Sequence, residues 1–180
     1  MDRVFKIVVT GPFNSGKTTF ISAISEIEVV ATERKTGKGA KKVNTTVAMD
    51  FGRITFPDGY VLHLYGTPGQ ERFDFMWEIL SEGMLGYVVL VDGSKPSSFE
   101  EVEGIVKAFR GMSAKPYVVC LTRSDRKDCV PPDTVRNDID HIGDVDIVKC
   151  DARKLKDVKE VLLALLERVL ERAEALEKAG

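Results

Sequence analysis

The sequence lacks a membrane-length apolar run, a large excess of charge of one sign, and the cysteine spacing of a zinc site or disulfide framework. Its 26 basic and 28 acidic side chains give a net charge of -2, so no global field attracts nucleic acid or a membrane. The three cysteines are odd in number and show no CxxC pair. We therefore expect one globular domain over residues 1–180, in a reducing compartment.

The sequence also has little that resembles a targeting segment. Its start lacks the charged and apolar regions of a signal peptide, and its end, "LEKAG", has no prenylation cysteine. We expect a cytoplasmic protein without a lipid anchor. The lysine-rich stretch "ERKTGKGAKK" favours a solvated loop over a polybasic contact, and it lacks the interleaved aromatics of a nucleic-acid site, so we expect no nucleic-acid partner.

Strand-like and helix-like segments alternate along the chain. "VFKIVVT" predicts a strand before the helical stretch "GKTTFISAIS", and "PDG" between two extended runs predicts a hairpin. "MLGYVVLVD", "PYVVCLT" and "VDIVKC" are typical of buried parallel strands, and residues 155–178 have the spacing of a helix packed on a sheet. The pattern predicts an α/β fold: a six-stranded, mostly parallel sheet with one antiparallel strand, flanked by helices, with ligands at the strands' carboxyl ends.

The stretch "GPFNSGKTT" matches the phosphate-loop pattern G-x-x-x-x-G-K-[ST], and it lies between the predicted first strand and helix. Glycines let backbone N–H groups converge on phosphates, Lys17 neutralises their charge, and the Thr18 hydroxyl is a magnesium ligand. A nucleoside triphosphate is therefore expected. The phosphate-binding candidates are Gly11, Asn14, Ser15, Gly16, Lys17, Thr18 and Thr19.

The choice of base is predicted from "TRSD", which ends a buried strand with Thr122, Arg123 and Asp125. A carboxylate accepts hydrogen bonds from guanine N1–H and the 2-amino group, whereas adenine N1 offers a lone pair. Arg123 can lie along a purine face, while Thr122 is short and is expected to tie this loop less firmly to the phosphate loop. We expect guanine preference with weakened affinity. The alternative is a plain polar exit from the strand.

Two further stretches carry a family resemblance. "TTVAMDFGRI" and "GTPGQERF" resemble the T-I-G-V-D-F and D-T-A-G-Q-E-R-F segments of Rab-like proteins, and "TRSD" resembles their N-K-x-D. With the phosphate loop, the resemblance to the Ras-like small GTPase superfamily covers residues 3–155. Within this superfamily, the chain looks most like the bacterial and archaeal branch related to the gliding-bacterium polarity switch, because it has the "GTPGQ" variant and no lipidation tail.

The resemblance implies a Ras-like G domain that cycles between GTP and GDP. It implies that Lys17 holds the β and γ phosphates, that Thr18 and Thr46 coordinate Mg²⁺, that Gly69 N–H senses the γ phosphate, and that Gln70 orients the attacking water. Asp151 and Ala152 occupy the positions of the family's loop in which a backbone N–H donates a hydrogen bond to guanine O6. Effectors, and a regulatory partner of the roadblock fold, are implied in the same way.

Departures from the family pattern lead to further expectations. Gly66 stands where an aspartate usually holds a magnesium-bound water, so magnesium affinity should fall unless Asp50 or a further water substitutes in part. Phe13 stands where a small glycine admits a partner's arginine finger, which predicts slow intrinsic hydrolysis. Either a partner repositions Gln70 or an arginine is supplied in cis, with Arg53, Arg34 and Arg72 as candidates. The alternative is that Phe13 packs on a neighbouring loop and each arginine is solvated, which we favour for Arg34.

The sequence leaves two principal functions open. The first is a GTP-hydrolysing switch that binds effectors in its GTP form. The second is a hydrolytically weak or inactive guanine-nucleotide-binding scaffold, which Gly66, Phe13 and the altered "TRSD" favour. A small P-loop kinase would need an arginine-rich acceptor lid that the sequence does not show, and Asp125 disfavours an ATPase.

Overall fold

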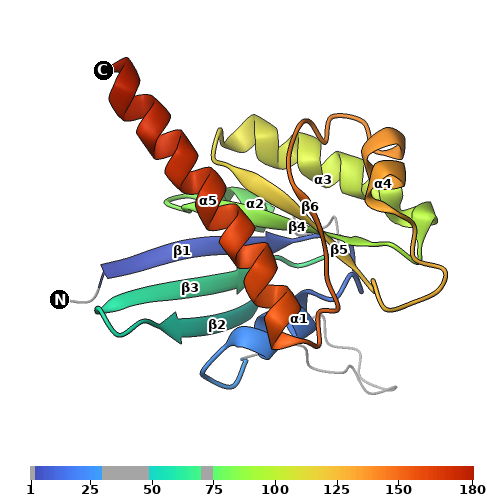
Figure 1. Ribbon diagram of the computed structural model, residues 1–180, viewed down its shortest axis with the longest axis horizontal. Helices are drawn as coiled ribbons and strands as arrows, with labels where there is room; N and C mark the ends of the chain where they lie inside the picture. Colours follow the sequence, from blue (N-terminus) through green and yellow to red (C-terminus); the bar gives the residue numbers. More distant parts are fainter. Residues whose placement is uncertain (1–2, 30–48, 70–74) are drawn as a thin grey trace, which may run out of the picture.

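Strand β1 (Arg3–Thr10) lies in the middle of a six-stranded sheet in the computed structural model, which describes residues 3–29, 49–69 and 75–180 (Figure 1). The strand order is β2-β3-β1-β4-β5-β6. The other strands are β2 (Asp50–Thr55), β3 (Tyr60–Gly66), β4 (Gly86–Asp92), β5 (Tyr117–Thr122) and β6 (Ile147–Lys149). Strand β2 runs antiparallel to β3, and every other pair of neighbours is parallel. The predicted six-stranded, mostly parallel sheet is confirmed.

The hairpin of β2 and β3 forms at the predicted turn. The Phe56 N–H donates to the Tyr60 carbonyl at 2.8 Å, and the Gly59 N–H donates to the Phe56 carbonyl at 3.1 Å. This closure fixes the register, so that Asp50 lies opposite Gly66 at the far end of the hairpin. The turn therefore decides which side chain of β2 reaches the carboxyl end of β3.

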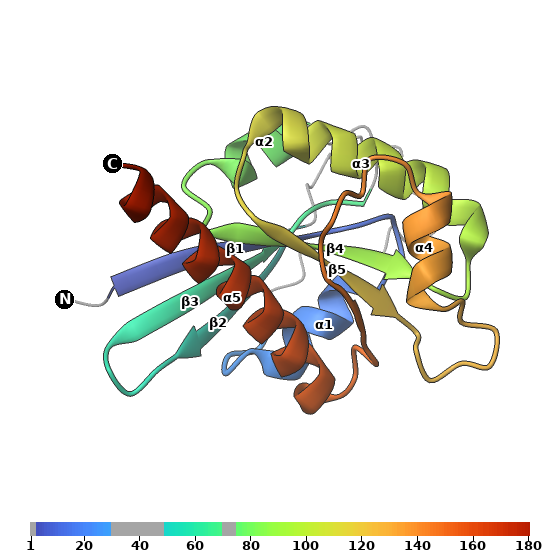
Figure 2. The same cartoon turned by 45° about the horizontal axis from the view of Figure 1, so that its top comes forward.

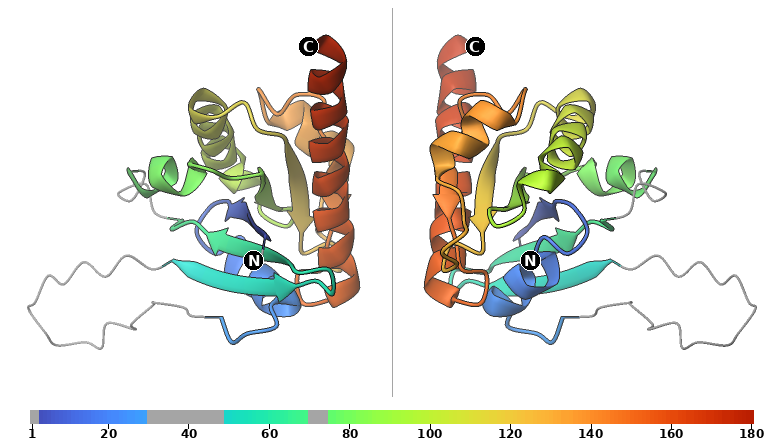
Figure 3. Two further views of the ribbon diagram at one scale, coloured as in Figure 1. Left: turned by 90° about the vertical axis from the view of Figure 1, so that its left-hand side faces the viewer. Right: turned by 90° about the vertical axis from the view of Figure 1, so that its right-hand side faces the viewer.

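Helices cover both faces of the sheet (Figures 2 and 3). Helices α1 (Lys17–Ile24) and α5 (Leu155–Ala179) pack on one face, around Ile7, Leu64 and Leu90. The other face is covered by α2 (Phe75–Ser81), α3 (Phe99–Met112), which follows the 3₁₀ turn η2 (Pro96–Ser98), and α4 (Pro132–Asp138). Strand β5 is buried over its whole length because it is covered from both sides, which explains its continuous apolar sequence.

Helix α5 packs on the sheet through its first half only. Its buried side chains are Val158, Val161, Leu162 and Leu165, and every residue from Leu170 onward is exposed. Figure 1 shows the last turns of α5 extending past the strands. The predicted helix is present, and the sheet contact belongs to its amino-terminal half. No helix among the described residues is both long enough and apolar enough to span a membrane.

Two leucines of α5 give a matched test of this packing. Leu165 is 0% exposed and Leu170 is 62% exposed. Leu165→Ala should lower the free energy of unfolding by about 2–5 kcal/mol, because it leaves a cavity in the core. Leu170→Ala makes the same chemical change in the same helix and should alter it by no more than about 0.5 kcal/mol. Urea denaturation measures both, and equal losses would contradict this account of α5.

Candidate nucleotide-binding site

The loop between β1 and α1 curls at the carboxyl end of β1. Gly11, Asn14 and Gly16 have φ angles of 151°, 65° and 104°, in the region that glycine tolerates best. A Cβ at Gly11 would lie 2.7 Å from the Leu90 carbonyl oxygen and 2.8 Å from Ser15 Oγ. Both glycines of the predicted phosphate loop are therefore required by its shape.

Lys17 begins α1 and is buried beneath this loop. Its Nζ donates to the carbonyl oxygens of Gly11 and Pro12, both at 2.7 Å. The neighbouring Ser15 side chain is 2% exposed, and its hydroxyl has no hydrogen-bond partner among the described residues. A buried ammonium group and an unsatisfied hydroxyl in one curled loop suit an anionic ligand such as a phosphate.

Thr18 lies in the first turn of α1 and points toward β2. Its hydroxyl donates to Asp50 Oδ2 at 2.6 Å. A Cβ built at Gly66 would lie 3.0 Å from Asp50 Cβ and 3.2 Å from Asp50 Oδ2. Position 66 thus lacks a carboxylate, and the side chain of its cross-strand partner brings one to the same place. Asp50 reaches Thr18, as our hypothesis of a substitute for the missing aspartate requires.

Gly69 lies directly against the phosphate loop. A Cβ at Gly69 would lie 2.6 Å from Phe13 Cα and 3.0 Å from Lys17 Nζ, so only glycine fits. The Phe13 side chain is 59% exposed. Four other predicted residues, Thr46, Gln70, Arg34 and Arg72, lie outside the described residues. Arg53 is described, and its Nε donates to Glu26 Oε1 at 2.8 Å, which gives it a structural partner away from the loop.

A second part of the site is a cavity of about 260 Å³. Three segments that are distant in the sequence line it: the phosphate loop, the exit of β5 and the exit of β6. Its lining residues are Ser15, Gly16, Thr19, Thr122, Arg123, Asp125, Arg126, Asp151, Ala152 and Arg153. The structure therefore brings the predicted base-recognition residues together, beside the phosphate loop.

The Thr122 side chain joins β5 to the phosphate loop. Its buried hydroxyl lies 3.0 Å from the Ser15 carbonyl oxygen and 3.1 Å from the Val91 carbonyl oxygen. Strand β5 ends close enough to the loop for this short side chain to reach it, and a weaker tie than an asparagine would make stays a prediction. Arg123 adds a second link, since its Nε donates to Asp92 Oδ2 at 3.0 Å and its Nη2 to the Asn14 carbonyl at 3.4 Å.

The exit of β6 differs in detail from the expectation. The Asp151 N–H donates to Asp157 Oδ2 at 2.8 Å, so it is already engaged, and Ala152 remains the candidate for contacting a base through its backbone. The Asp151 carboxylate is buried and accepts hydrogen bonds from Arg153, which lower its pKa to about 2. Arg153 also reaches Asp125. Sequence reasoning missed this contact, and its only signal was an arginine two residues after an acid at a strand end.

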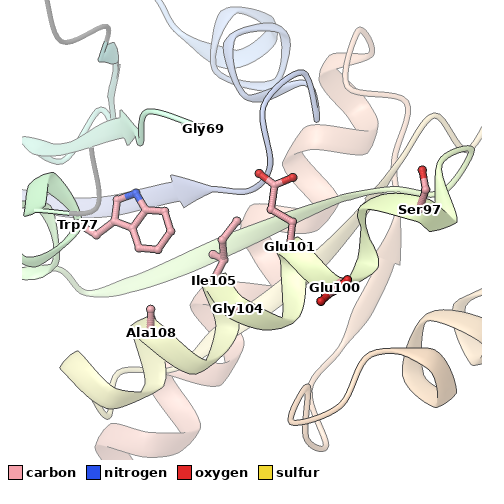
Figure 4. Close-up of a pocket in the computed structure, with 8 residues that line it drawn as sticks. All are labelled: Gly69, Trp77, Ser97, Glu100, Glu101, Gly104, Ile105 and Ala108. Carbon is pink, nitrogen blue, oxygen red and sulfur yellow. The ribbon is translucent and has the colours of Figure 1, made fainter. Parts of the chain in front are cut away.

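A second cavity, of about 500 Å³, lies between α2 and α3 (Figure 4). Its lining residues are Gly69, Trp77, Ser97, Glu100, Glu101, Gly104, Ile105 and Ala108. Trp77 Nε1 donates to the Pro68 carbonyl at 3.4 Å, so α2 is tied to the residue that precedes Gly69. This cavity could not be predicted from the sequence, because its lining comes from separate segments.

Comparison with known proteins identifies the family. The model of a family described as "conserved hypothetical ATP binding protein" matches residues 28–177. The chain belongs to this family. The match begins after the phosphate loop and includes the exits of β5 and β6, so the case for phosphate binding comes from the loop geometry of this chain.

Relatives of the chain include Ras-related proteins. Uncharacterized protein MJ1339 of Methanocaldococcus jannaschii is 35% identical over 120 residues, which cover 67% of this chain and 70% of that protein. Ras-related protein RABA2a of Arabidopsis thaliana is 28% identical over 120 residues, covering 67% of this chain and 52% of the relative. Ras-related protein Rab-21 of Mus musculus is 23% identical over 189 residues, which cover 97% of this chain and 77% of that protein.

These relatives and the sheet give one consistent assignment. The six-stranded sheet with its single antiparallel strand is that of a Ras-like P-loop nucleotide-binding fold, and Ras-related proteins are among the relatives at low identity. The family description and the Ras-related relatives both support nucleotide binding.

Proposed function

We propose that this chain is a guanine-nucleotide switch, folded as one domain over residues 1–180, that hydrolyses GTP slowly with Mg²⁺ and binds effectors in its GTP form. One observation carries the proposal: Asp125 lines the same cavity as Gly16 and Thr19 of the phosphate loop. A nucleotide whose phosphates lie at the loop would place its base at this cavity. We propose that the protein acts in the cytoplasm, and a regulator of the roadblock fold stays a prediction of the family resemblance.

Asp125 supports guanine over adenine, although the family description names ATP. The carboxylate has only acceptors, which match the N1–H and 2-amino donors of guanine. The same carboxylate would face the N1 lone pair of adenine and be repelled. Arg123, which bridges Asp92 and the phosphate loop, would place its aliphatic stem along the wall of the base cavity.

The phosphate end supports binding of a magnesium nucleotide. Hydroxyl and carboxylate oxygens are the hard donors that Mg²⁺ prefers, and Thr18 and Asp50 supply one of each. No cluster of three or more His, Cys, Asp or Glu side chains suited to a metal occurs in residues 3–29, 49–69 and 75–180, so the nucleotide phosphates would provide further ligands. The ion would neutralise charge on the phosphates, and Lys17 would contribute in the same way.

Hydrolysis would depend on groups beside the phosphate loop. The Gly69 N–H would donate to the γ phosphate, and Gln70, by resemblance, would orient the attacking water. The Phe13 backbone lies against Gly69 and its side chain is exposed, so the benzyl group would obstruct an arginine from a partner, which supports slow turnover. The same observation favours the second candidate, a hydrolytically weak scaffold that holds bound nucleotide.

The function is tested by identifying the nucleotide that denatured protein releases, and by measuring phosphate release from GTP and from ATP. We expect GDP or GTP to be released, and slow turnover that is selective for GTP. Asp125→Asn should shift the preference toward xanthosine nucleotide, because an amide donates where the carboxylate accepted. Lys17→Ala should abolish nucleotide binding, and Gln70→Leu should slow turnover.

Bound guanine nucleotide without turnover would favour the scaffold. Equal use of ATP, or an unchanged base preference in Asp125→Asn, would contradict guanine recognition by Asp125.

Trp77 is the only tryptophan of the chain, and it can report on switching. If Gly69 moves to meet a γ phosphate, the hydrogen bond from Trp77 to Pro68 will transmit the change to the indole. Exchange of bound GDP for a non-hydrolysable GTP analogue should therefore change the tryptophan fluorescence, and exchange of GDP for GDP should not. Trp77→Phe should remove the signal while the analogue still binds. Identical spectra in both nucleotide states would contradict the switch.

Asp50 should matter for magnesium. Asp50→Ala removes the carboxylate that binds the Thr18 hydroxyl, so magnesium affinity in the presence of GDP should fall by about tenfold or more. Titration of magnesium against the rate of GDP release measures this effect. Asp58→Ala is the matched control, because it removes an exposed carboxylate of the same hairpin at its opposite end. An unchanged magnesium midpoint in Asp50→Ala would eliminate the substitution hypothesis.

A further inference from the structure

Arg153 connects two carboxylates at the rim of the base cavity. Its Nη2 donates to Asp125 Oδ2 at 2.9 Å, and the same nitrogen donates to Asp151 Oδ2 at 2.8 Å. Its Nε donates to Asp151 Oδ1 at 2.8 Å. The guanidinium group thus binds Asp151 through two nitrogens and uses one of them to hold Asp125.

Asp151 provides a fixed anchor for this arginine. The Asp151 side chain is 4% exposed, whereas that of Arg153 is 68% exposed. The backbone N–H of Arg153 also donates to Asp151 Oδ1, at 3.1 Å. Two parallel bonds from a planar guanidinium to a buried carboxylate fix the plane of the guanidinium group. Arg153 is therefore oriented from its buried side, although most of its surface is in solvent.

Asp125 has no comparable anchor of its own. It lies in the loop after β5, its side chain is 39% exposed, and Arg153 is the only side chain among the described residues that hydrogen-bonds its carboxylate. A solvated carboxylate rotates freely, so its two oxygens have no fixed direction without such a bond. Oδ1 accepts no hydrogen bond from the part of the chain that the structure describes, and Oδ2 keeps a second lone pair, so the bond to Arg153 leaves Asp125 able to accept from a base.

We propose that Arg153 is a positioning residue for base recognition: it ties Asp125 to the buried Asp151 and so orients both oxygens of Asp125 toward the two donors of guanine. This inference rests on the proposed guanine-nucleotide function. Lysine cannot replace arginine in this role, because an ammonium group has no planar fork to bind Asp151 through two nitrogens and extend to Asp125.

The role predicts a specific change in base discrimination. Guanine offers Asp125 two donors, whereas hypoxanthine lacks the 2-amino group and offers one. GDP and IDP share their ribose and phosphates, so a general loosening of the fold or of the phosphate loop changes both affinities equally. The ratio of the two dissociation constants therefore isolates the orientation of Asp125 from structural damage.

The experiment measures the dissociation constants of GDP and IDP by calorimetry for the nucleotide-free, full-length chain. The wild-type protein should bind GDP about 10- to 100-fold more tightly than IDP, as expected for one more hydrogen bond to a charged group. In Arg153→Lys and in Arg153→Ala the ratio should fall to about threefold or less, the range of a poorly directed bond. Because Arg153→Lys keeps the charge, its loss of discrimination would come from geometry.

Arg126→Ala is the matched control. Arg126 lines the same cavity, but its guanidinium binds Asp128 instead of Asp125. Its loss should leave the ratio of GDP to IDP affinity at the wild-type value, even if both affinities change. A fall in the ratio equal to that of the Arg153 variants would show that the loss is not specific to the link between Asp125 and Asp151, and it would overturn the proposal.

Two failures can be distinguished. If the wild-type protein does not prefer GDP to IDP and ADP, the guanine function itself fails. If the wild-type protein discriminates, Asp125→Asn abolishes the discrimination, and both Arg153 variants keep the wild-type ratio, then guanine recognition stands and the positioning role of Arg153 is overturned.

Discussion

Strand β1 lies between β3 and β4 and runs parallel to both, and the site depends on this pairing. Parallel pairing continues through β5 and β6, so the carboxyl ends of five strands meet at one edge of the sheet. Backbone hydrogen bonds extend the pairing beyond the strands, with Thr67 N–H to the Val9 carbonyl at 2.9 Å and Cys150 N–H to the Leu121 carbonyl at 2.9 Å. The loops of the site therefore leave the sheet from fixed positions.

The core stabilises this arrangement because the central strands are buried from both sides. Ile7, Val88 and Val118 face α1 and α5, whereas Val89 and Val119 face the helices of the other layer. A shift of one residue in any central strand would exchange these two sets of side chains between the faces. Packing in two layers thus protects the register on which the alignment of the loops depends.

The charges of the site are divided between its two ends. At one end Lys17 lies among backbone carbonyls of the phosphate loop. At the other end arginines pair with carboxylates, Arg123 with Asp92 and Arg153 with Asp125 and Asp151. An elongated ligand that is anionic at one end and carries hydrogen-bond donors at the other complements this division. The net charge of the chain, which is close to zero, gives no hint of it.

Local sequence was sufficient for features whose residues are neighbours along the chain. The curled phosphate loop, the hairpin at Pro57 to Gly59 and the long last helix all follow from short patterns of glycine, proline and apolar residues. Contacts between distant residues could not be predicted in the same way. Arg153 reaches Asp125 across 28 positions, and the Trp77 indole reaches back nine positions to the Pro68 carbonyl, so both contacts depend on side-chain direction.

The pairing of Asp50 with Gly66 has a consequence for recognising proteins of this kind. A linear pattern that demands an aspartate three residues before Gly69 would reject this chain, although a carboxylate lies beside that position on the adjacent strand. A side chain of the same chemistry can thus reach one place in space from another part of the chain. Patterns written over cross-strand pairs, instead of over consecutive letters, would recover such relocated side chains.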